Sequence, residues 1–413
     1  MSKVLLLGAT FSKNKGSEAM LVSTIKSIRE CIENSDFILL SIFPDEDSKK
    51  AVEYDVKVSK YSTSVLNYLG NILLSFFYYV LNKLKFDTNE MILNAFLKKF
   101  KESDIILDLS GDGFSDDYGV IETLASCYDI LLCKLLNKPI VIFAQSIGPF
   151  NTILTKKLSK FFLNRVDILI VREKISRDYL MSIGINNKIY LTADSAFLLK
   201  PEKSSVINQI ASNEGLNLNK KHIVGISVSQ LIFELDRNPK HSNSYIELMA
   251  YLADYLVEKY SANIVFIPHV TSNSIDDRFV SREIYNLVVN KDNMVLIDGE
   301  YSAEETKGII SKCDLFIGAR MHANIAATSM HVPTLAISYS HKFYGIMEML
   351  DVDDYVYDFH EINKENITAK IDLLWNNRFE IKKTLEYNVR KLKKCAFQNI
   401  ELVDEFLNVN NKK

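Results

Sequence analysis

Residues 314–342 read DLFIGARMHANIAATSMHVPTLAISYSHK and indicate the fold more clearly than any other part of the chain. The short apolar run at the start of this stretch is typical of a buried strand. The middle carries small or flexible apolar residues at the i, i+3, i+4 and i+7 spacing of one helix face: Ala323, Ala326, Ala327 and Met330. Pro333 ends that helix, and residues 334–338 are typical of a second buried strand. This order predicts a βαβ unit with a right-handed crossover.

Polar and charged residues follow both strands of this unit. Arg320 and His322 come after the first strand, and Ser340, His341 and Lys342 come after the second. The carboxyl ends of parallel strands meet at one edge of the sheet, where open α/β sheets bind ligands. An arginine and a histidine at a helix N-terminus, with hydroxyls and a lysine nearby, suit a small, highly charged anion.

The composition excludes several classes of function. With 413 residues, of which 47% are hydrophobic and 24% charged, the chain is expected to form two soluble globular domains. The net charge of −3 gives no argument for nucleic acid, and no signature of DNA or RNA binding is visible. The five cysteines form no CxxC pair, and no His/Cys cluster has zinc spacing. We expect buried free thiols in a reducing cytosol, and no metal site.

Apolar strands alternate with amphipathic helices along the whole chain, which predicts a doubly wound α/β fold. The strands expected in the first half are residues 4–7, 37–41, 105–109, 140–144, 168–171 and 188–191. Those expected in the second half are residues 223–228, 264–267, 294–297, 315–318 and 334–338. A polar stretch near residues 200–220 separates the two series, so we predict domains at 1–205 and 206–413 that face each other across a cleft.

Several residues of the first half lie where strands are predicted to end. Asn14 and Gly16 stand in a loop before a helix, where they could contact an anion or sugar hydroxyls, or simply cap the helix. Asp112 and Asp116 follow the strand that ends at residue 109, and they could bind sugar hydroxyls, act as a base, or be solvated turn carboxylates. Arg172 could be an anion ligand or a structural ion-pair partner.

In the second half, His269 follows the strand at 264–267, and its predicted position is the same sheet edge as that of Arg320 and His322. A single histidine is usually structural. Two of the seven histidines converging on one edge beside an arginine favour a functional role for both.

The segment from Val65 to Leu81, VLNYLGNILLSFFYYVL, carries no formal charge. It falls short of the ~20 apolar residues that a spanning helix needs. Three interpretations stay open: a buried or surface-docked helix, an interfacial contact with a membrane, and a true span.

Several segments together resemble the polysaccharide pyruvyl transferase family. They are KNKGSEAML, DLSGDGFSDDYG, QSIGPF, VREKISRDYL, ADSAFLL, IPHV and CDLFIGARMHANIAATSMHVPTLAISYSHKFYGI. They are spread from residue 8 to about residue 345. The Arg-Met-His element is the most specific of them. Two departures from the family pattern concern Ser17, where many members have aspartate, and Ser229 with Gln230, where some members have a basic residue.

The resemblance implies a fold like that of GT-B glycosyltransferases, with two Rossmann-like domains. It also implies transfer of pyruvate from phosphoenolpyruvate to two hydroxyls of a sugar, which forms a pyruvate ketal and releases phosphate. The acceptor would be a surface polysaccharide or its lipid-linked precursor. Such an enzyme needs no cofactor besides phosphoenolpyruvate as co-substrate, and it would be cytoplasmic, with residues 65–81 as a contact to the inner membrane face.

The resemblance assigns roles to the residues above. His322 is expected to protonate the methylene carbon of the donor, with Asp112 as first and His269 as second candidate for the base. The expected donor-binding residues are Arg320, His322, Ser340, Lys342 and Arg172. The expected acceptor-binding residues are Asn14, Gly16, Asp112 and Asp116.

Two other functions use the same fold. A GT-B glycosyltransferase would bind a nucleotide sugar in the same cleft, and it often has acidic residues near the donor ribose. Glu304 and Glu305 are the candidates, but their context favours the start of an exposed helix capped by Ser302. The second alternative is a non-catalytic protein that binds a sugar or an anion.

Overall fold

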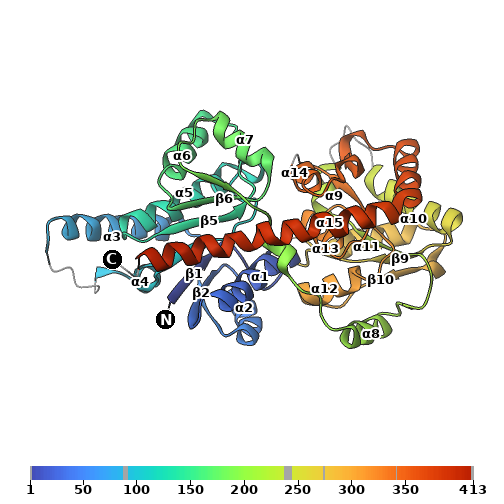
Figure 1. Ribbon diagram of the computed structural model, residues 1–413, viewed down its shortest axis with the longest axis horizontal. Helices are drawn as coiled ribbons and strands as arrows, with labels where there is room; N and C mark the ends of the chain where they lie inside the picture. The colour runs from blue at the N-terminus through green and yellow to red at the C-terminus, as the bar shows by residue number, and fades with distance from the viewer. Residues whose placement is uncertain (1, 87–91, 237–243, 273–274, 341, 411–413) are drawn as a thin grey trace. The chain divides into compact units, whose positions relative to one another are not determined.

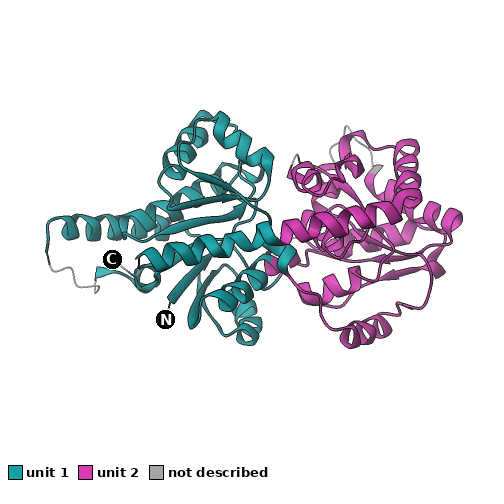
Figure 2. Ribbon diagram, in the orientation of Figure 1, with its two compact units in different colours: residues 1–12, 20–198, 394–413 teal, residues 13–19, 199–393 magenta. Residues whose placement is uncertain are grey.

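The computed structural model describes residues 2–86, 92–236, 244–272, 275–340 and 342–410. It divides into two compact units, which Figure 2 shows in different colours. Unit 1 comprises Met1–Ser12, Met20–Leu198 and Lys394–Lys413, and unit 2 comprises Lys13–Ala19 and Leu199–Lys393. The sequence predicted a single boundary, with domains at 1–205 and 206–413. It did not predict that residues 13–19 belong to unit 2 or that residues 394–413 belong to unit 1.

Unit 1 contains a parallel sheet of seven strands in the order β3-β2-β1-β4-β5-β6-β7. The strands are β1 (Ser2–Leu7), β2 (Ser35–Ser41), β3 (Val56–Lys60), β4 (Ile105–Asp108), β5 (Ile140–Gln145), β6 (Ile168–Val171) and β7 (Ile189–Leu191). The helices are α1 (Lys15–Cys31), α2 (Pro44–Ala51), α3 (Val65–Lys83), α4 (Ala95–Glu102), α5 (Val120–Leu135), α6 (Ile153–Leu163) and α7 (Lys174–Ser182). Helices α5, α6 and α7 cover one face of the sheet, and α1 and α2 cover the other (Figure 1).

Unit 2 contains a parallel sheet of six strands in the order β10-β9-β8-β11-β12-β13. The strands are β8 (Ile223–Ser227), β9 (Asn263–Phe266), β10 (Met294–Leu296), β11 (Leu315–Gly318), β12 (Thr334–Ser338) and β13 (Val356–Asp358). The helices are α8 (Ser204–Asn213), α9 (Gln230–Asp236), α10 (Ser244–Tyr260), α11 (Asp277–Leu287), α12 (Ala303–Ile310), α13 (Met321–Ser329) and α14 (Lys342–Glu348). The last helix, α15 (Lys364–Asn410), begins in unit 2 and continues into unit 1.

Short 3-10 helices occupy some of the connections. They are η1 (Val52–Tyr54), η3 (Asp116–Tyr118), η4 (Ser195–Leu198), η5 (Lys291–Asn293), η6 (Asp353–Tyr355) and η7 (Phe359–Glu361).

The predicted α/β fold is confirmed, and every strand predicted from the sequence is present. The sequence did not predict β3 and β13, each of which is one of the two edge strands of its sheet. Residues 56–60 read VKVSK and are only partly covered, and β13 is three residues long. Neither strand produces the continuous apolar run that marks a central parallel strand.

The βαβ unit predicted from residues 314–342 is also confirmed. Strands β11 and β12 pair in parallel, with Phe316 opposite Thr334 and Gly318 opposite Ala336. Helix α13 crosses between them and begins directly after Arg320. The amide of Asn324 donates to the carbonyl of Gly318 at 3.1 Å, and a side chain at Gly318 would collide with it. This close approach of helix and strand fixes where the first turn of α13 lies.

Helix α3 is the one helix among the described residues that is long and apolar enough to cross a membrane. Only 17% of its most apolar 18-residue window is buried inside the protein. Of the interpretations left open by the sequence, a fully buried helix is excluded, and α3 is docked on the surface of unit 1 through α5. The expectation of buried thiols is wrong for Cys31, which is exposed at the last turn of α1.

Candidate functional site

The carboxyl edge of the unit 2 sheet is organised by an ion pair between Arg320 and Asp277. Nη2 of Arg320 donates to one carboxylate oxygen of Asp277 at 2.6 Å, and Nε donates to the other at 3.2 Å. The Asp277 side chain is fully buried, and that of Arg320 is 12% exposed. Because these bonds use Nε and Nη2, the remaining nitrogen Nη1 is not bonded to Asp277.

Asp277 joins the ends of three strands. Its carboxylate also accepts hydrogen bonds from the backbone amides of Gln230 at 3.1 Å, His269 at 3.3 Å and Val270 at 2.9 Å. These residues follow β8 and β9, and Arg320 follows β11. The sequence analysis did not identify Asp277. An aspartate that opens a helix is common, and no spacing links it to Arg320 43 residues away.

The contact with Asp277 also keeps the Arg320 guanidinium charged. Burial of the guanidinium by itself favours the neutral form. The negative charge of Asp277 and the hydrogen bonds to it outweigh burial and raise the pKa of Arg320 above its ordinary value. Arg320 is therefore a permanent cation in a fixed orientation.

His269 lies at the same edge and is neutral near pH 7. The side chain is 4% exposed, and Nδ1 has no hydrogen-bond partner among the described residues. Burial, followed by the nearby charges of His322, Arg320 and Lys15, holds the pKa of His269 well below its usual value of 6.5. A neutral imidazole cannot donate a proton as an imidazolium does.

A segment from the start of the chain completes this part of unit 2. Lys13–Lys15 runs antiparallel to His269–Thr271: the amide of Lys15 donates to the carbonyl of His269 at 2.9 Å, and the amide of Thr271 donates to that of Lys13 at 2.9 Å. The side-chain oxygen of Asn14 accepts from the amides of Gly16 at 2.9 Å and Ser17 at 3.2 Å, so Asn14 caps α1. The sequence left both roles open for Asn14, and the structure shows the capping role.

Gly16 packs directly against the imidazole of His322. A side chain at Gly16 would overlap Nδ1, Cγ and Cβ of His322, so only glycine leaves room for this ring. His322 is in the first turn of α13 and is partly buried. The structure therefore brings together Gly16, His322, His269 and Arg320, which the sequence had assigned to two different domains.

Lys15 is a member of this cluster that the sequence analysis missed. Its side chain is 4% exposed and its ammonium group lies 3.6 Å from the carboxylate of Glu18. The charge of Lys15 is one of those that act on His269. Lysine before a helix is ordinary in sequence, so only its burial identifies it.

Ser340 and Lys342 follow β12, the neighbour of β11. The Ser340 hydroxyl accepts from the amide of Lys342 at 3.3 Å, and the Lys342 side chain is 2% exposed at the start of α14. Tyr339, just before them, acts electrostatically on Arg320. His341 lies outside the described residues.

Unit 1 has a second group of polar residues, after β4. Asp112 accepts a hydrogen bond from the hydroxyl of Tyr118 at 2.6 Å. Both line an open pocket of about 410 Å³, together with Ser110, Gly113 and Glu122. This pocket leaves the Asp112 carboxylate accessible at a sheet edge.

The nearby Asp116 has a different environment. Its carboxylate accepts from the hydroxyls of Thr123 at 2.7 Å and Thr155 at 2.6 Å, and from the backbone amides of Asn151 at 2.6 Å and Thr152 at 3.3 Å. Burial alone would raise its pKa, but these hydrogen bonds outweigh burial and lower it. Asp116 joins the starts of α5 and α6, so its role is structural.

Arg172 is also structural. The side chain has no exposed surface and donates to Asp194 at 2.6 Å and to the Ser146 hydroxyl at 2.8 Å, all within unit 1. The sequence had proposed it as a donor ligand with a structural ion pair as the alternative, and this geometry is that of the ion pair.

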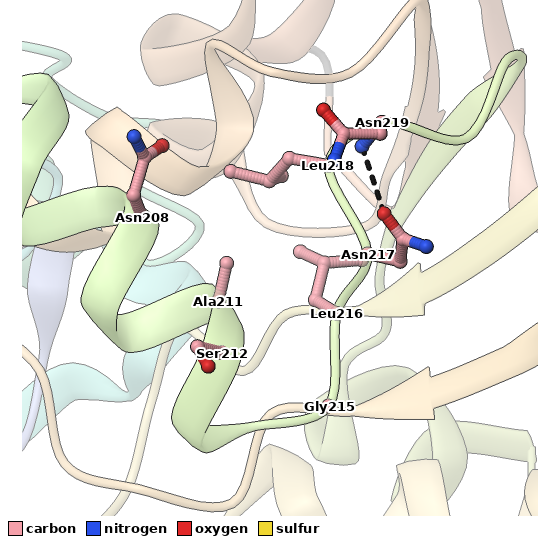
Figure 3. Close-up of a pocket in the computed structure, with 8 residues that line it drawn as sticks. All are labelled: Asn208, Ala211, Ser212, Gly215, Leu216, Asn217, Leu218 and Asn219. Atoms are coloured by element: carbon pink, nitrogen blue, oxygen red, sulfur yellow. Dashed lines mark hydrogen bonds between the residues drawn. The ribbon is translucent and has the colours of Figure 1, made fainter.

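Two further features do not carry chemistry. Figure 3 shows a pocket of about 500 Å³ between α8 and the segment Gly215–Asn219 that leads into the amino end of β8; the residues drawn there include no charged side chain and no histidine. Ser302 caps α12, as the sequence predicted, and Glu305 forms a capping box with it, although most residues of α12 are buried. Within the described ranges, no group of three or more His, Cys, Asp or Glu side chains could hold a metal ion.

Comparison with known proteins gives a family and a fold. The model of the polysaccharide pyruvyl transferase family matches residues 14–341. The amylovoran biosynthesis protein AmsJ of Erwinia amylovora is 25% identical over 402 residues, which cover 92% of this chain and 93% of that protein.

The similar solved structures have the GT-B fold. UDP-GlcNAc 2-epimerase from Neisseria meningitidis, bound to UDP-GlcNAc, has a TM-score of 0.64 at 14% identity over 98% of this chain and 100% of its own. Alr3699/HepE from Anabaena, in complex with UDP-glucose, has a TM-score of 0.57 at 13% identity over the full length of both chains. At these identities the likeness concerns the fold alone.

The depressed pKa of His269 predicts a pH dependence of stability. Below about pH 6.5 the unfolded chain takes up a proton at this residue and the folded protein does not, so stability falls as the pH decreases. Urea unfolding of the wild type and of His269→Gln from about pH 7 to about pH 5 should show a shallower loss in the variant. The difference in slope should approach about 1.4 kcal/mol per pH unit. His360→Gln removes an exposed imidazole and is the matched control. Parallel curves for the wild type and His269→Gln would contradict the burial of a neutral imidazole.

Proposed function

We propose, from the premise that this chain belongs to the polysaccharide pyruvyl transferase family, that it transfers pyruvate from phosphoenolpyruvate to two hydroxyls of one sugar. The products would be a pyruvate ketal and phosphate. The observation that carries the proposal is the cluster of Arg320, His322, His269 and Lys15 around the N-terminus of α13. The similarity to AmsJ, an amylovoran biosynthesis protein, supports a surface polysaccharide or its lipid-linked precursor as the acceptor.

The charge pattern of the cluster suits phosphoenolpyruvate. This donor carries a phosphate and a carboxylate close together, so it needs fixed cations and backbone N–H groups in a small space. Arg320 provides a cation held in place by Asp277. The backbone N–H groups of the first turn of α13 point out of the N-terminal end of the helix, where an anion can accept hydrogen bonds from them. Lys342 and Ser340, at the end of the adjacent strand, would contribute further donors to the phosphate.

The two histidines would have different roles. Ketal formation begins when an acid protonates the methylene carbon of the donor, which leaves C2 electrophilic. Because burial keeps His269 neutral, His322 is the histidine suited to deliver this proton. A sugar hydroxyl attacks C2 and loses its proton to a base. The C2–O bond to phosphate then breaks, which makes C2 electrophilic again, and the second hydroxyl attacks C2 and gives its proton to the imidazole of His322. Arg320 would hold the leaving phosphate.

Asp112 is the first candidate for the base that activates the sugar hydroxyl. Its carboxylate lies in an open pocket with the Tyr118 hydroxyl, which suits a saccharide acceptor. His269 is the second candidate. Asp116 and Arg172 are left out of the proposed site because their polar atoms already have structural partners.

The proposed reaction needs no metal and no cofactor, since the cations of the protein can offset the charge of the donor. The proposed location is the cytoplasm, where phosphoenolpyruvate is available. A lipid-linked acceptor would lie at the inner membrane face, and residues 65–81 are the proposed contact.

The donor and its site can be tested by thermal unfolding with phosphoenolpyruvate, UDP-glucose or phosphate. We expect phosphoenolpyruvate to stabilise the wild type, by about 2.7 kcal/mol at a hundred times its dissociation constant. The shift should disappear in Arg320→Ala and largely disappear in Arg320→Lys, which keeps the charge but not the two-pronged contact with Asp277. Arg282→Ala, which removes an exposed arginine paired with Asp298, is the control and should shift like the wild type. A shift with UDP-glucose but not with phosphoenolpyruvate would instead support the glycosyltransferase alternative.

The role of His322 can be tested through its contact with Gly16. His322→Ala should abolish phosphate release from phosphoenolpyruvate in the presence of acceptor. Gly16→Ala should reduce the rate by about 100-fold or more, because the added methyl group displaces the imidazole from its position. The control is Gly70→Ala, where no atom lies within 4 Å of the added methyl group. Full activity of His322→Ala would rule out this residue as the acid.

Asp112 and Asp116 provide a matched pair of carboxylates. Asp112→Asn should lower kcat by about 100-fold or more with little change in stability, because the pocket loses its base. Asp116→Asn should destabilise the protein by about 1–3 kcal/mol, because it weakens several partly buried hydrogen bonds at once. Unfolding midpoints and kcat measured side by side separate the two roles. A normal kcat in Asp112→Asn would transfer the role of base to His269.

A further inference from the structure

Helix α3 (Val65–Lys83) packs Tyr68, Ile72 and Leu74 against the core of unit 1 but leaves several of its largest apolar side chains exposed. The buried residues of this helix are polar or amphipathic: Asn71, Ser75 and Tyr78. The side chains on the opposite side are large, apolar and more than half exposed: Leu66, Leu69, Leu73, Phe76 and Phe77. These five residues, which we call the outer face of α3, follow the i, i+3, i+7, i+10 and i+11 spacing of one helical stripe. An ordinary surface helix of a soluble protein does not leave such a stripe exposed.

Contacts with unit 1 fix this orientation. The amide of Asn71 donates to the Tyr128 hydroxyl on α5 at 3.0 Å, and the amide of Asn94 donates to Asn71 at 2.7 Å. The ring of Tyr68 packs edge-on against that of Tyr128, with 4.5 Å between centroids. Rotating α3 to bury the leucines would leave the polar side chains of its inner face without these partners. The outer face therefore stays exposed unless something outside this chain covers it.

The charges around α3 indicate the chemistry of what covers it. Residues 56–86 contain no Asp or Glu and contain four exposed lysines, Lys57, Lys60, Lys83 and Lys85. Residues 87–102 add Lys98, Lys99 and Lys101 and the acidic residues Asp87, Glu90 and Glu102, so residues 56–102 hold seven lysines against three acidic residues. Leucine and phenylalanine on one side of a helix, with lysines near both of its ends, match an apolar layer edged by negative charge. An anionic lipid bilayer has this structure.

We propose that the outer face of α3 inserts into the interfacial layer of an anionic membrane and holds the protein there. With 19 residues, α3 is about 28 Å long, which approaches the thickness of a bilayer core. It nevertheless lies along the surface and does not span, because its inner face is bound to α5. An acceptor with a lipid carrier would then reach the protein in the plane of the same membrane, and this last step rests on the proposed function.

The test uses the full-length protein and vesicles that pellet on centrifugation. The vesicles contain phosphatidylcholine alone, or with about 30% phosphatidylglycerol. The variant Leu69→Gln, Leu73→Gln, Phe77→Gln removes three side chains of the outer face. The matched control, Leu287→Gln, Val289→Gln, Leu373→Gln, removes three exposed apolar side chains from unit 2.

We expect the wild type and the control to bind anionic vesicles, more weakly in about 0.5 M salt, and the outer-face variant to bind at least about tenfold more weakly. Unfolding midpoints of the variant close to those of the wild type show that it has folded. Equal binding by the variant, or no binding by the wild type, overturns the proposal. A wild-type dimer in light scattering that the variant abolishes also overturns it, since a second copy would then cover the outer face.

Membrane binding and catalysis can fail independently. The outer-face variant should retain turnover with a soluble acceptor sugar, because none of the three residues lies in the proposed site. Vesicle binding without turnover would therefore contradict only the proposed function, and turnover without vesicle binding would contradict only the membrane contact.

Discussion

The buried carboxylate of Asp277 is the constraint on which the candidate site of unit 2 depends. It accepts from Nε and Nη2 of Arg320 and from backbone amides after two other strands, so it links the loops beyond β8, β9 and β11. Removing one partner of a buried ion pair typically costs about 3–5 kcal/mol, because the other charge is left unpaired. The pair therefore contributes rigidity more than net stability. A rigid cation is what a site for a small trianion needs, since little ordering remains to occur on binding.

The sequence was sufficient for the fold because parallel α/β sheets repeat one signal. Each central strand is a short apolar run between polar loops, and the stretch at 314–342 shows strand, helix and strand in a single reading. The same logic located Arg320, His322 and His269, which all follow strands. Asp277 and Lys15 follow no such rule. Their importance comes from burial and from contacts between distant segments, and residue type alone does not reveal either.

The segment Lys13–Ala19 shows where sequence reasoning about domains fails. Its position in the chain assigns it to the first domain, yet it forms a bridge with Val270 and packs Gly16 against His322 in unit 2. Two backbone hydrogen bonds, from Lys15 to His269 and from Thr271 to Lys13, hold the segment in this position. The absence of a side chain at Gly16 leaves room for His322. A family motif in this segment therefore contributes to the Arg320–His322 cluster of unit 2, although the sequence had assigned the motif to the other domain.

Asp116 and α3 illustrate the same physical rule from opposite directions. A buried polar group finds its partners within the protein, whereas a contiguous exposed apolar patch marks a surface suited to contact with something outside the chain. Asp116 resembles a ligand-binding residue in sequence, but four donors use its carboxylate. The sequence left a buried or surface-docked helix open for residues 65–81, and α3 is docked on α5, with Asn71 hydrogen-bonded on its inner side. The hydrogen-bond partners of a polar side chain thus distinguish a structural residue from a candidate binding residue.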